Sequence, residues 1–276
     1  MTPIKTSGMK KDELIQLRVE KSFADQLNAL ADRKQVPLSV MLRMWMAEKL
    51  EAAGKAELAK RSAWVEERIK NIKTEGFAEG PLLVMHAFST AANAKLRVDI
   101  LKQYPQLVVP GHGHRRMTSE ILQHGLSAVV RQGDEKVVAR GEAFKTGELE
   151  FVCWAPSEED QLYGLQLDSM IVNAVQGLCA MYKKHEIDVS YVIRTSLLNA
   201  EGLTPVTLKV LASNHKHSQY SSNKIDLPEI TITSPDQLSS TAKTAESLID
   251  VLDELWHAAG QECSPSFDHN LKWAQK

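Results

Sequence analysis

The sequence of 276 residues predicts an α+β protein with a small N-terminal module and a larger mixed domain. Three observations predict this class: one alternating strand followed by two helical patterns, a charged helical stretch at 55–75, and a long remainder rich in strand patterns divided by turn residues. We expect an N-terminal module at 1–54, a connecting helix at 55–79, a mixed domain with an antiparallel meander at 80–260, and a loosely held tail at 261–276.

The first element is a short strand whose side chains alternate between two faces. One face is apolar and is formed by Ile15, Leu17 and Val19. The other face carries Leu14, Gln16 and Arg18. Because a lone short strand is unstable and no second strand follows nearby, the simplest partner is the same strand of a second copy. The resulting two-stranded ribbon would expose its polar face, and such a ribbon fits the DNA major groove.

The first helix follows this strand directly. Ser22 with Asp25 three residues later is close to a capping box and predicts the helix start. The helix is expected to stop near Gln35, because Val36 precedes Pro37 and is biased away from helical geometry.

A second helix is predicted to begin at Pro37, where a missing N–H costs nothing, and to stop at Gly54. Its residues 40–50 are apolar on nearly every side, so a helix in so small a segment needs cover from another subunit. The expected homodimer interface comprises Ile15, Leu17, Val19, Leu42, Trp45 and Met46.

Residues 13–53 resemble a ribbon-helix-helix DNA-binding domain of the Arc/MetJ type. The resemblance lies in the strand Ile15–Val19, the first helix, the break at Gln35–Pro37, and Ser39 and Leu42-Arg43 of the second helix. Members of that family are dimers that insert paired strands into the major groove, while the start of the second helix holds a phosphate. The resemblance implies base contacts from Leu14, Gln16 and Arg18, and phosphate contacts from Lys21, Ser39 and Arg43. Leu14 departs from the polar residue of many members and could contact a thymine methyl group.

Residues 13–53 also fit an amphipathic dimerisation module with no role on DNA. The charge distribution favours the DNA reading modestly: residues 1–75 hold 15 Lys and Arg against 11 Asp and Glu, while the remainder holds 18 against 24. A basic end on a mildly acidic chain suits a nucleic-acid-binding arm.

Composition limits the remaining classes. No apolar run approaches the roughly 20 residues that span a bilayer, and the N-terminus lacks the apolar core of a signal peptide, so we expect a cytoplasmic protein without a membrane partner. The three cysteines, an odd number spread along the chain, suit a reducing compartment. Each is expected to be a small buried apolar residue: Cys153, Cys179 and Cys263.

The larger domain combines strands with a few helices. Strands are predicted at 82–88, 127–131, 136–144, 149–154, 188–198, 206–211 and 230–232, and the three between 127 and 154 form a meander. Helices are predicted at 96–104, 160–184 and 236–258. The order of these elements is similar to that in a domain of bacterial Schlafen-like proteins. The similarity lies in the strand at 82–88, Arg115-Arg116 before the meander, the long helix, and a strand ending in Ser196-Leu197-Leu198. It implies an architecture and little about chemistry.

The loop Gly111–Arg116 is the clearest candidate for a second site. Its side chains His112, His114, Arg115 and Arg116 could contact an anion or nucleic acid, whereas a metal site needs further ligands that no spacing supplies. We expect no metal and no cofactor. A polar stretch at 214–224 is a surface loop or a further nucleic-acid contact with Tyr220 stacked on a base. No phosphate-binding loop, nucleophile elbow or zinc-protease motif occurs, so no catalysis is expected.

These features lead to one leading hypothesis and two others. The leading one is a homodimeric, site-specific transcription regulator of prokaryotic, phage or plasmid type that binds a palindromic double-stranded operator, with a further protein partner open to its larger domain. The second is an antitoxin-like protein-interaction or maintenance factor whose N-terminal module mainly dimerises. The third is an enzyme with a DNA-targeting arm, whose chemistry no motif identifies.

Overall fold

The computed structural model divides the chain into two compact units, Met1–Glu66 and Glu67–Lys276. It describes residues 20–72, 77, 79–90, 94–110, 117–132, 136–187, 190–207, 218–268 and 270–274. The predicted strand with Leu14, Ile15, Gln16, Leu17, Arg18 and Val19 lies outside the described residues, as do His112, His114, Arg115 and Arg116.

Helix α1 spans Lys21–Lys34 and stops where the sequence predicts. Gln35 adopts the left-handed conformation, with φ of 53°, and its N–H caps the carbonyls at the end of the helix. The predicted capping box of Ser22 and Asp25 is wrong. The N–H groups of Phe23 and Ala24 both donate to the carbonyl of Glu20, so Ser22 already lies within the first turn.

Helix α2 spans Leu38–Ile72 without interruption, so the predicted stop at Gly54 is wrong. Pro37 precedes it and its carbonyl accepts the first helical hydrogen bonds. A mid-helix glycine costs about 1 kcal/mol relative to alanine, which strong helix formers on both sides offset. The ion pair Glu51–Lys55 spans Gly54 and the pair Glu57–Arg61 follows it, and both add support to the helix. Residues 55–72 are helical as predicted.

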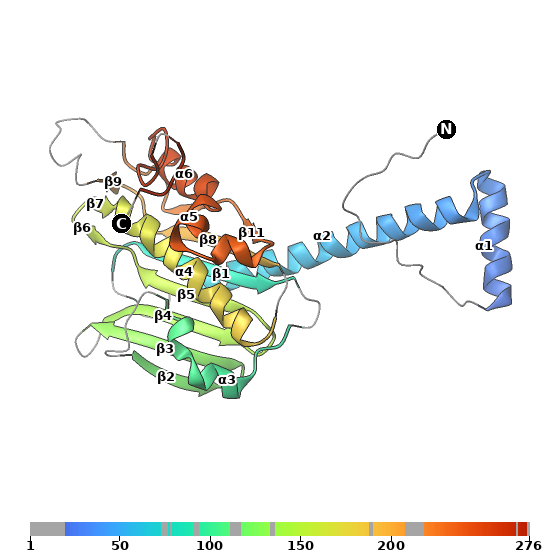
Figure 1. Ribbon diagram of the computed structural model, residues 1–276, viewed down its shortest axis with the longest axis horizontal. Coiled ribbons are helices and arrows are strands. Elements are labelled where there is room, and N and C mark those ends of the chain that lie inside the picture. The colour runs from blue at the N-terminus through green and yellow to red at the C-terminus, as the bar shows by residue number, and fades with distance from the viewer. Residues whose placement is uncertain are drawn as a thin grey trace. The chain divides into compact units, whose positions relative to one another are not determined.

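An antiparallel sheet forms the centre of the larger unit (Figure 1). In the described residues, its strands run in the order β10-β8-β1-β5-β4-β3-β2, and β11 also pairs with β8. Their bounds are β1 Leu82–Ser89, β2 Met117–Leu122, β3 Gly125–Gln132, β4 Lys136–Phe144, β5 Leu149–Trp154, β8 Tyr191–Leu198, β10 Lys224–Asp226 and β11 Ile230–Ile232. The predicted meander is therefore present, and β2 extends it by one strand that the sequence analysis missed. A smaller sheet comprises β6 Ser157–Glu158, β7 Gln161–Tyr163 and β9 Thr204–Val206.

The main hydrophobic core lies between one face of the sheet and helix α4, Gly164–Lys184, which crosses that face (Figure 1). Alternate strand residues such as Met85 and Phe151 point into this core, together with Leu167 and Leu178 of α4. Helix α3, Val98–Gln103, and the 3-10 turn η1, Pro105–Leu107, also contribute core residues or pack against them. The helix predicted at 160–184 is α4, which begins four residues later than predicted because Gln161–Tyr163 pairs with β9 as strand β7.

The predicted helix at 236–258 is divided into three pieces: η2 Pro235–Leu238, α5 Thr241–Glu246 and α6 Ile249–His257. A single helix is wrong because Ser240 is extended and its side chain caps the N–H of Lys243, which starts a new helix there.

The segment after Gln261, predicted as a loosely held tail, is instead anchored at its start. Ser264 and Ser266 are buried, and their hydroxyls donate to the Asp168 carboxylate of α4 at 2.7 and 2.5 Å. The indole of Trp256 donates to the same carboxylate at 3.2 Å. Burial raises the pKa of Asp168 to about 6, even though these hydrogen bonds act to lower it.

Two side chains of the larger unit, those of Tyr220 and Cys263, differ from the prediction in their exposure to solvent. Tyr220 cannot stack on a base, because it is buried and its hydroxyl donates to the carbonyl of Leu255 at 3.0 Å. Cys153 and Cys179 are buried as expected, but Cys263 is exposed. It precedes the anchored segment and does not enter the core.

Candidate functional site

Helices α1 and α2 of the smaller unit leave large apolar side chains exposed. Met44 is 65% exposed and Trp45 48%, and Phe23, Val40 and Met46 are each exposed by 40% or more. The only buried residue of α1 is Ala31. Soluble proteins rarely expose a contiguous apolar patch of this kind unless it binds something.

A groove of about 460 Å³ lies among these side chains. Phe23, Leu27 and Leu30 line it from α1, and Met41 and Trp45 line it from α2. Lys34 and Glu48 supply charge within the same lining. The groove is thus mostly apolar with charges of both signs, as in a protein-binding surface.

The predicted interface and phosphate-contacting residues of this unit are accessible. Trp45 and Met46 are exposed, and Leu42 is half-buried and lines the groove. Lys21 opens α1, and Ser39 and Arg43 lie in the first two turns of α2. All three of these polar side chains are exposed. Their roles on DNA remain predictions, because the predicted base-contacting strand lies outside the described residues.

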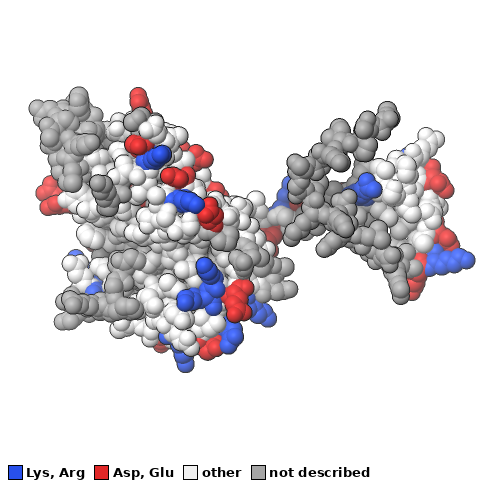
Figure 2. All heavy atoms as spheres, viewed as in Figure 1, with Lys and Arg blue, Asp and Glu red and all other residues white. Residues whose placement is uncertain are grey.

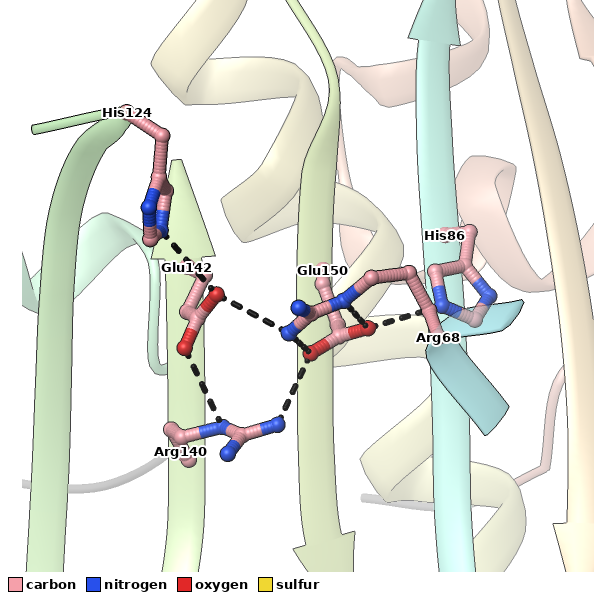
Figure 3. A network of polar contacts seen from close by, with 6 residues as sticks. All are labelled: Arg68, His86, His124, Arg140, Glu142 and Glu150. Carbon is pink, nitrogen blue, oxygen red and sulfur yellow. Dashed lines mark hydrogen bonds and ion pairs between the residues drawn. The ribbon is translucent and has the colours of Figure 1, made fainter. Parts of the chain in front are cut away.

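The larger unit holds a second candidate site, a network of charged side chains on the sheet face opposite α4 (Figure 3). The strand register creates it, since Glu142 of β4 pairs with Glu150 of β5, and Glu150 pairs with His86 of β1. Cross-strand partners share one face, so these side chains form a row. Arg68, in the last turn of α2, lies over the same row.

Glu150 is the centre of the network and is fully buried. Arg68 binds it through two nitrogens, with Nε 2.9 Å from Oε2 and Nη2 2.6 Å from Oε1. Arg140 donates from Nη2 to Oε1 at 2.9 Å, and Nε2 of His86 lies 3.0 Å from Oε2. Every lone-pair direction of this carboxylate is therefore engaged.

Glu142 forms the outer part of the network. Its Oε2 accepts from Nη2 of Arg68 at 2.9 Å and lies 3.5 Å from Nε2 of His124. Its Oε1 lies 3.7 Å from Nε of Arg140. His124 is half exposed and stacks on the ring of Phe144. The network thus runs from a fully buried centre to a histidine at the surface.

Electrostatics keeps Glu150 ionised. Burial acts to raise its pKa, but hydrogen bonds from Arg68 and His86 and the positive charges of both outweigh burial, so the pKa lies well below its usual range. The same Arg68 bridges both glutamates. Two carboxylates that share a guanidinium in this way form an anchor, and the ionised Glu150 has no proton to donate near neutral pH. The network therefore holds the last turn of α2 against the sheet.

The sequence analysis missed this network, although a signal for it was present. His86 interrupts the apolar run of β1, and Glu150 interrupts that of β5. A charged residue is almost never fully buried unless it is paired, so each interruption predicts a partner. The partners come from residues 68 and 140–142, and only the strand register brings these together.

Three further observations bear on the candidate sites. In the described part of the chain, no group of three or more His, Cys, Asp or Glu side chains could hold a metal ion. None of the described helices is both long and apolar enough to cross a membrane. On the face shown in Figure 2, the described basic and acidic side chains of the larger unit are interspersed.

No protein-family model, curated protein or solved structure matches this chain.

Proposed function

We propose that the protein is a homodimeric, site-specific DNA-binding transcription regulator that reads a palindromic operator with paired N-terminal strands. The observation that carries the proposal is the exposed apolar face of α1 and α2, including Trp45 and Met44. Two helices with so little buried apolar surface cannot be stable in water on their own account. They require a partner on this face.

A second copy of the chain is the partner that fits best. A two-fold interface places the same patch of both subunits together, so an apolar patch covers itself without a further protein. The groove between α1 and α2 can receive apolar side chains of the other subunit, and Trp45 is a typical anchor for such an interface. The charges of Lys34 and Glu48 at the lining can pair across the two-fold axis.

The proposed DNA contact rests on the resemblance of residues 13–53 to ribbon-helix-helix domains and on the exposed side chains that accompany it. The short break between α1 and α2 and the exposed Ser39 at the start of α2 agree with that pattern. N–H groups in the first turn of a helix bind phosphate readily, and Arg43 and Lys21 are accessible to support such a contact. Gln16 and Arg18 would then read base edges in the major groove.

The test is selection of bound sequences from random double-stranded DNA by the full-length protein and by the Gln16→Ala/Arg18→Ala variant. We expect the parent to enrich a palindrome and the variant to enrich none. At fixed salt, Arg18→Ala should weaken binding to that palindrome by about 1–3 kcal/mol, the value of a good bidentate base contact. Lys60→Ala, on the exposed side of α2, is the matched control and should bind as the parent does.

The exposed face also favours one alternative, an antitoxin-like interaction factor whose N-terminal module only dimerises. The same experiment separates the two. A stable dimer that enriches no DNA sequence would support the alternative and refute the regulator. Deletion of residues 1–20 provides a second test. If the protein is a regulator, the deletion should abolish DNA binding. If the alternative holds, residues 80–276 should still capture a protein partner after the deletion.

A further inference from the structure

A pocket of about 1100 Å³ lies within the larger unit, away from the charged network. It is placed where β1 ends and β8 begins, since Thr90 directly follows β1, Ser190 directly precedes β8, and both line it. Helix α4 forms one wall, with Gln176, Cys179 and Lys183 on the lining face. Pockets that bind small molecules usually have volumes of about 300–1,000 Å³, so this one is large enough for a ligand and ordered water.

The floor of the pocket is apolar. Cys179, Tyr191 and Ile232 are each buried and line it. Burial raises the pKa of the Cys179 thiol to about 12, so this side chain is neutral at physiological pH and behaves as a small apolar group. Ala180 and Leu238 complete this surface. A ligand therefore needs an apolar body.

Three polar side chains of the lining already donate hydrogen bonds within the protein. The hydroxyl of Thr90 donates to the carbonyl of Ser190 at 2.9 Å, and that of Ser239 donates to the carbonyl of Asp236 at 2.7 Å. The amide nitrogen of Gln176 donates to Thr244 at 3.1 Å. Because the protons of these two hydroxyls are already used, the Thr90 and Ser239 oxygens are left to accept from a ligand. Gln176 offers its carbonyl oxygen as an acceptor and its second N–H as a donor.

Two opposite charges flank these acceptors. Lys183 lies in the last turn of α4, and Glu186 lies two residues beyond the end of that helix, with φ of 57°. Both side chains are exposed, and in the described part of the chain no ion pair joins them to each other. The lining thus presents one cation, one carboxylate and several neutral acceptors above an apolar floor.

We propose that this pocket binds a free α-amino acid with a bulky apolar side chain. The carboxylate of the ligand pairs with Lys183, its ammonium group pairs with Glu186 and donates to the hydroxyl acceptors, and its side chain covers the Cys179 floor. Lys183 and Glu186 both line the pocket, so the carboxylate and the ammonium group of one α-carbon can each meet an opposite charge there. The larger unit would then sense a small molecule. This binding is independent of DNA and would hold whether or not the N-terminal module binds an operator.

The test measures binding to full-length protein without DNA, by titration calorimetry with L-tryptophan, L-phenylalanine and L-leucine. Tryptamine, which lacks the carboxylate, and indole-3-propionate, which lacks the ammonium group, are matched probes. We expect each to bind at least about tenfold more weakly than L-tryptophan, as the loss of one charged contact implies. Lys183→Gln should remove the preference over tryptamine, and Glu186→Gln the preference over indole-3-propionate.

Lys184→Gln is the control variant, because the Lys184 ammonium lies over the ring of Tyr104 and outside the lining. It should bind L-tryptophan as the parent does. The proposal is overturned if none of the twenty common amino acids binds at millimolar concentration. It is equally overturned if the Lys183 and Glu186 variants, folded by their unfolding curves, bind the three indole probes as the parent does.

Discussion

Apolar and charged side chains are exposed in helices α1 and α2 of the smaller unit but buried in the sheet of the larger unit. In the helices, Trp45 and Met44 are exposed, and the Glu51–Lys55 ion pair is open to solvent. In the sheet, apolar residues are buried on both faces, and the pair of Arg68 and Glu150 is almost completely buried. The sheet unit therefore completes its own core, whereas α1 and α2 leave large apolar side chains exposed to solvent.

The two kinds of ion pair also differ in what they contribute. An exposed pair is screened by water and contributes about 0–1 kcal/mol. A buried pair is costly to form, because both charges lose their hydration, but it is far more costly to break from one side. The Glu150 network therefore specifies which residues must meet, while the surface pairs of α2 contribute little beyond helix propensity.

The largest expected effect comes from removing the central charge of the network. Glu150→Gln leaves Arg68 and Arg140 without their shared carboxylate, and we expect the free energy of unfolding to fall by about 3–5 kcal/mol. Urea unfolding followed by circular dichroism measures this change. Glu51→Gln is the matched control, because it removes the exposed ion pair with Lys55. It should change the free energy of unfolding by less than about 0.5 kcal/mol. Similar losses for the two variants would remove the contrast between the regions.

A pH-dependent effect of on the order of 3 kcal/mol is expected from Asp168, the buried acid that holds Ser264 and Ser266. Its pKa of about 6 in the folded state exceeds its ordinary value of 3.8. Between these pH values the folded protein holds a proton that the unfolded chain has released, so stability falls as pH rises from about 4 to 6.

Asp168→Asn removes this ionisation, so its unfolding free energy should lack that fall. Urea unfolding at pH 4, 5, 6 and 7 measures the difference between parent and variant. The exposed Glu201→Gln serves as the control and should keep the parent's pH profile. An unchanged profile in Asp168→Asn would show that the carboxyl titrates normally.

A smaller effect, about 2 kcal/mol or more in dimer dissociation, is expected from Trp45→Ala, since buried tryptophans are common anchors of interfaces. Sedimentation equilibrium of the full-length protein measures the dissociation constant. Leu58→Ala is a fair control, because Leu58 is similarly exposed on α2 but does not line the groove. If both variants dimerise as the parent does, the apolar face of α1 and α2 does not form the interface.

Local patterns predicted much of the fold. The bounds of β4 and β5 match the predicted strands, because alternation and turn residues on both sides specify them within a few residues. The end of α1 was predicted for a similar reason, since the residue before a proline leaves helical geometry. The stop at Gly54 failed because a helix passes through one glycine when its neighbours favour helix.

The candidate sites were predictable to different degrees. Trp45, Met46 and Ser39 belong to one local pattern, so the sequence placed them on a common module. The Glu150 network and the pocket beside Cys179 draw residues from segments far apart in the chain. Their members carry only a faint local signal, such as the charge within β5, and no spacing rule joins Arg68 to Glu142.

Periodicity within short windows was enough to predict the α+β class, the meander and the apolar character of residues 40–50. Three-dimensional packing was needed to show which charges meet, that Tyr220 is buried, and that Asp168 holds Ser264 and Ser266. The Arg68–Glu142 and Ser264–Asp168 contacts join residues 74 and 96 positions apart, so no pattern within a short window specifies them. Burial then makes the pairing obligatory, since an unpaired charge inside the protein would cost several kcal/mol.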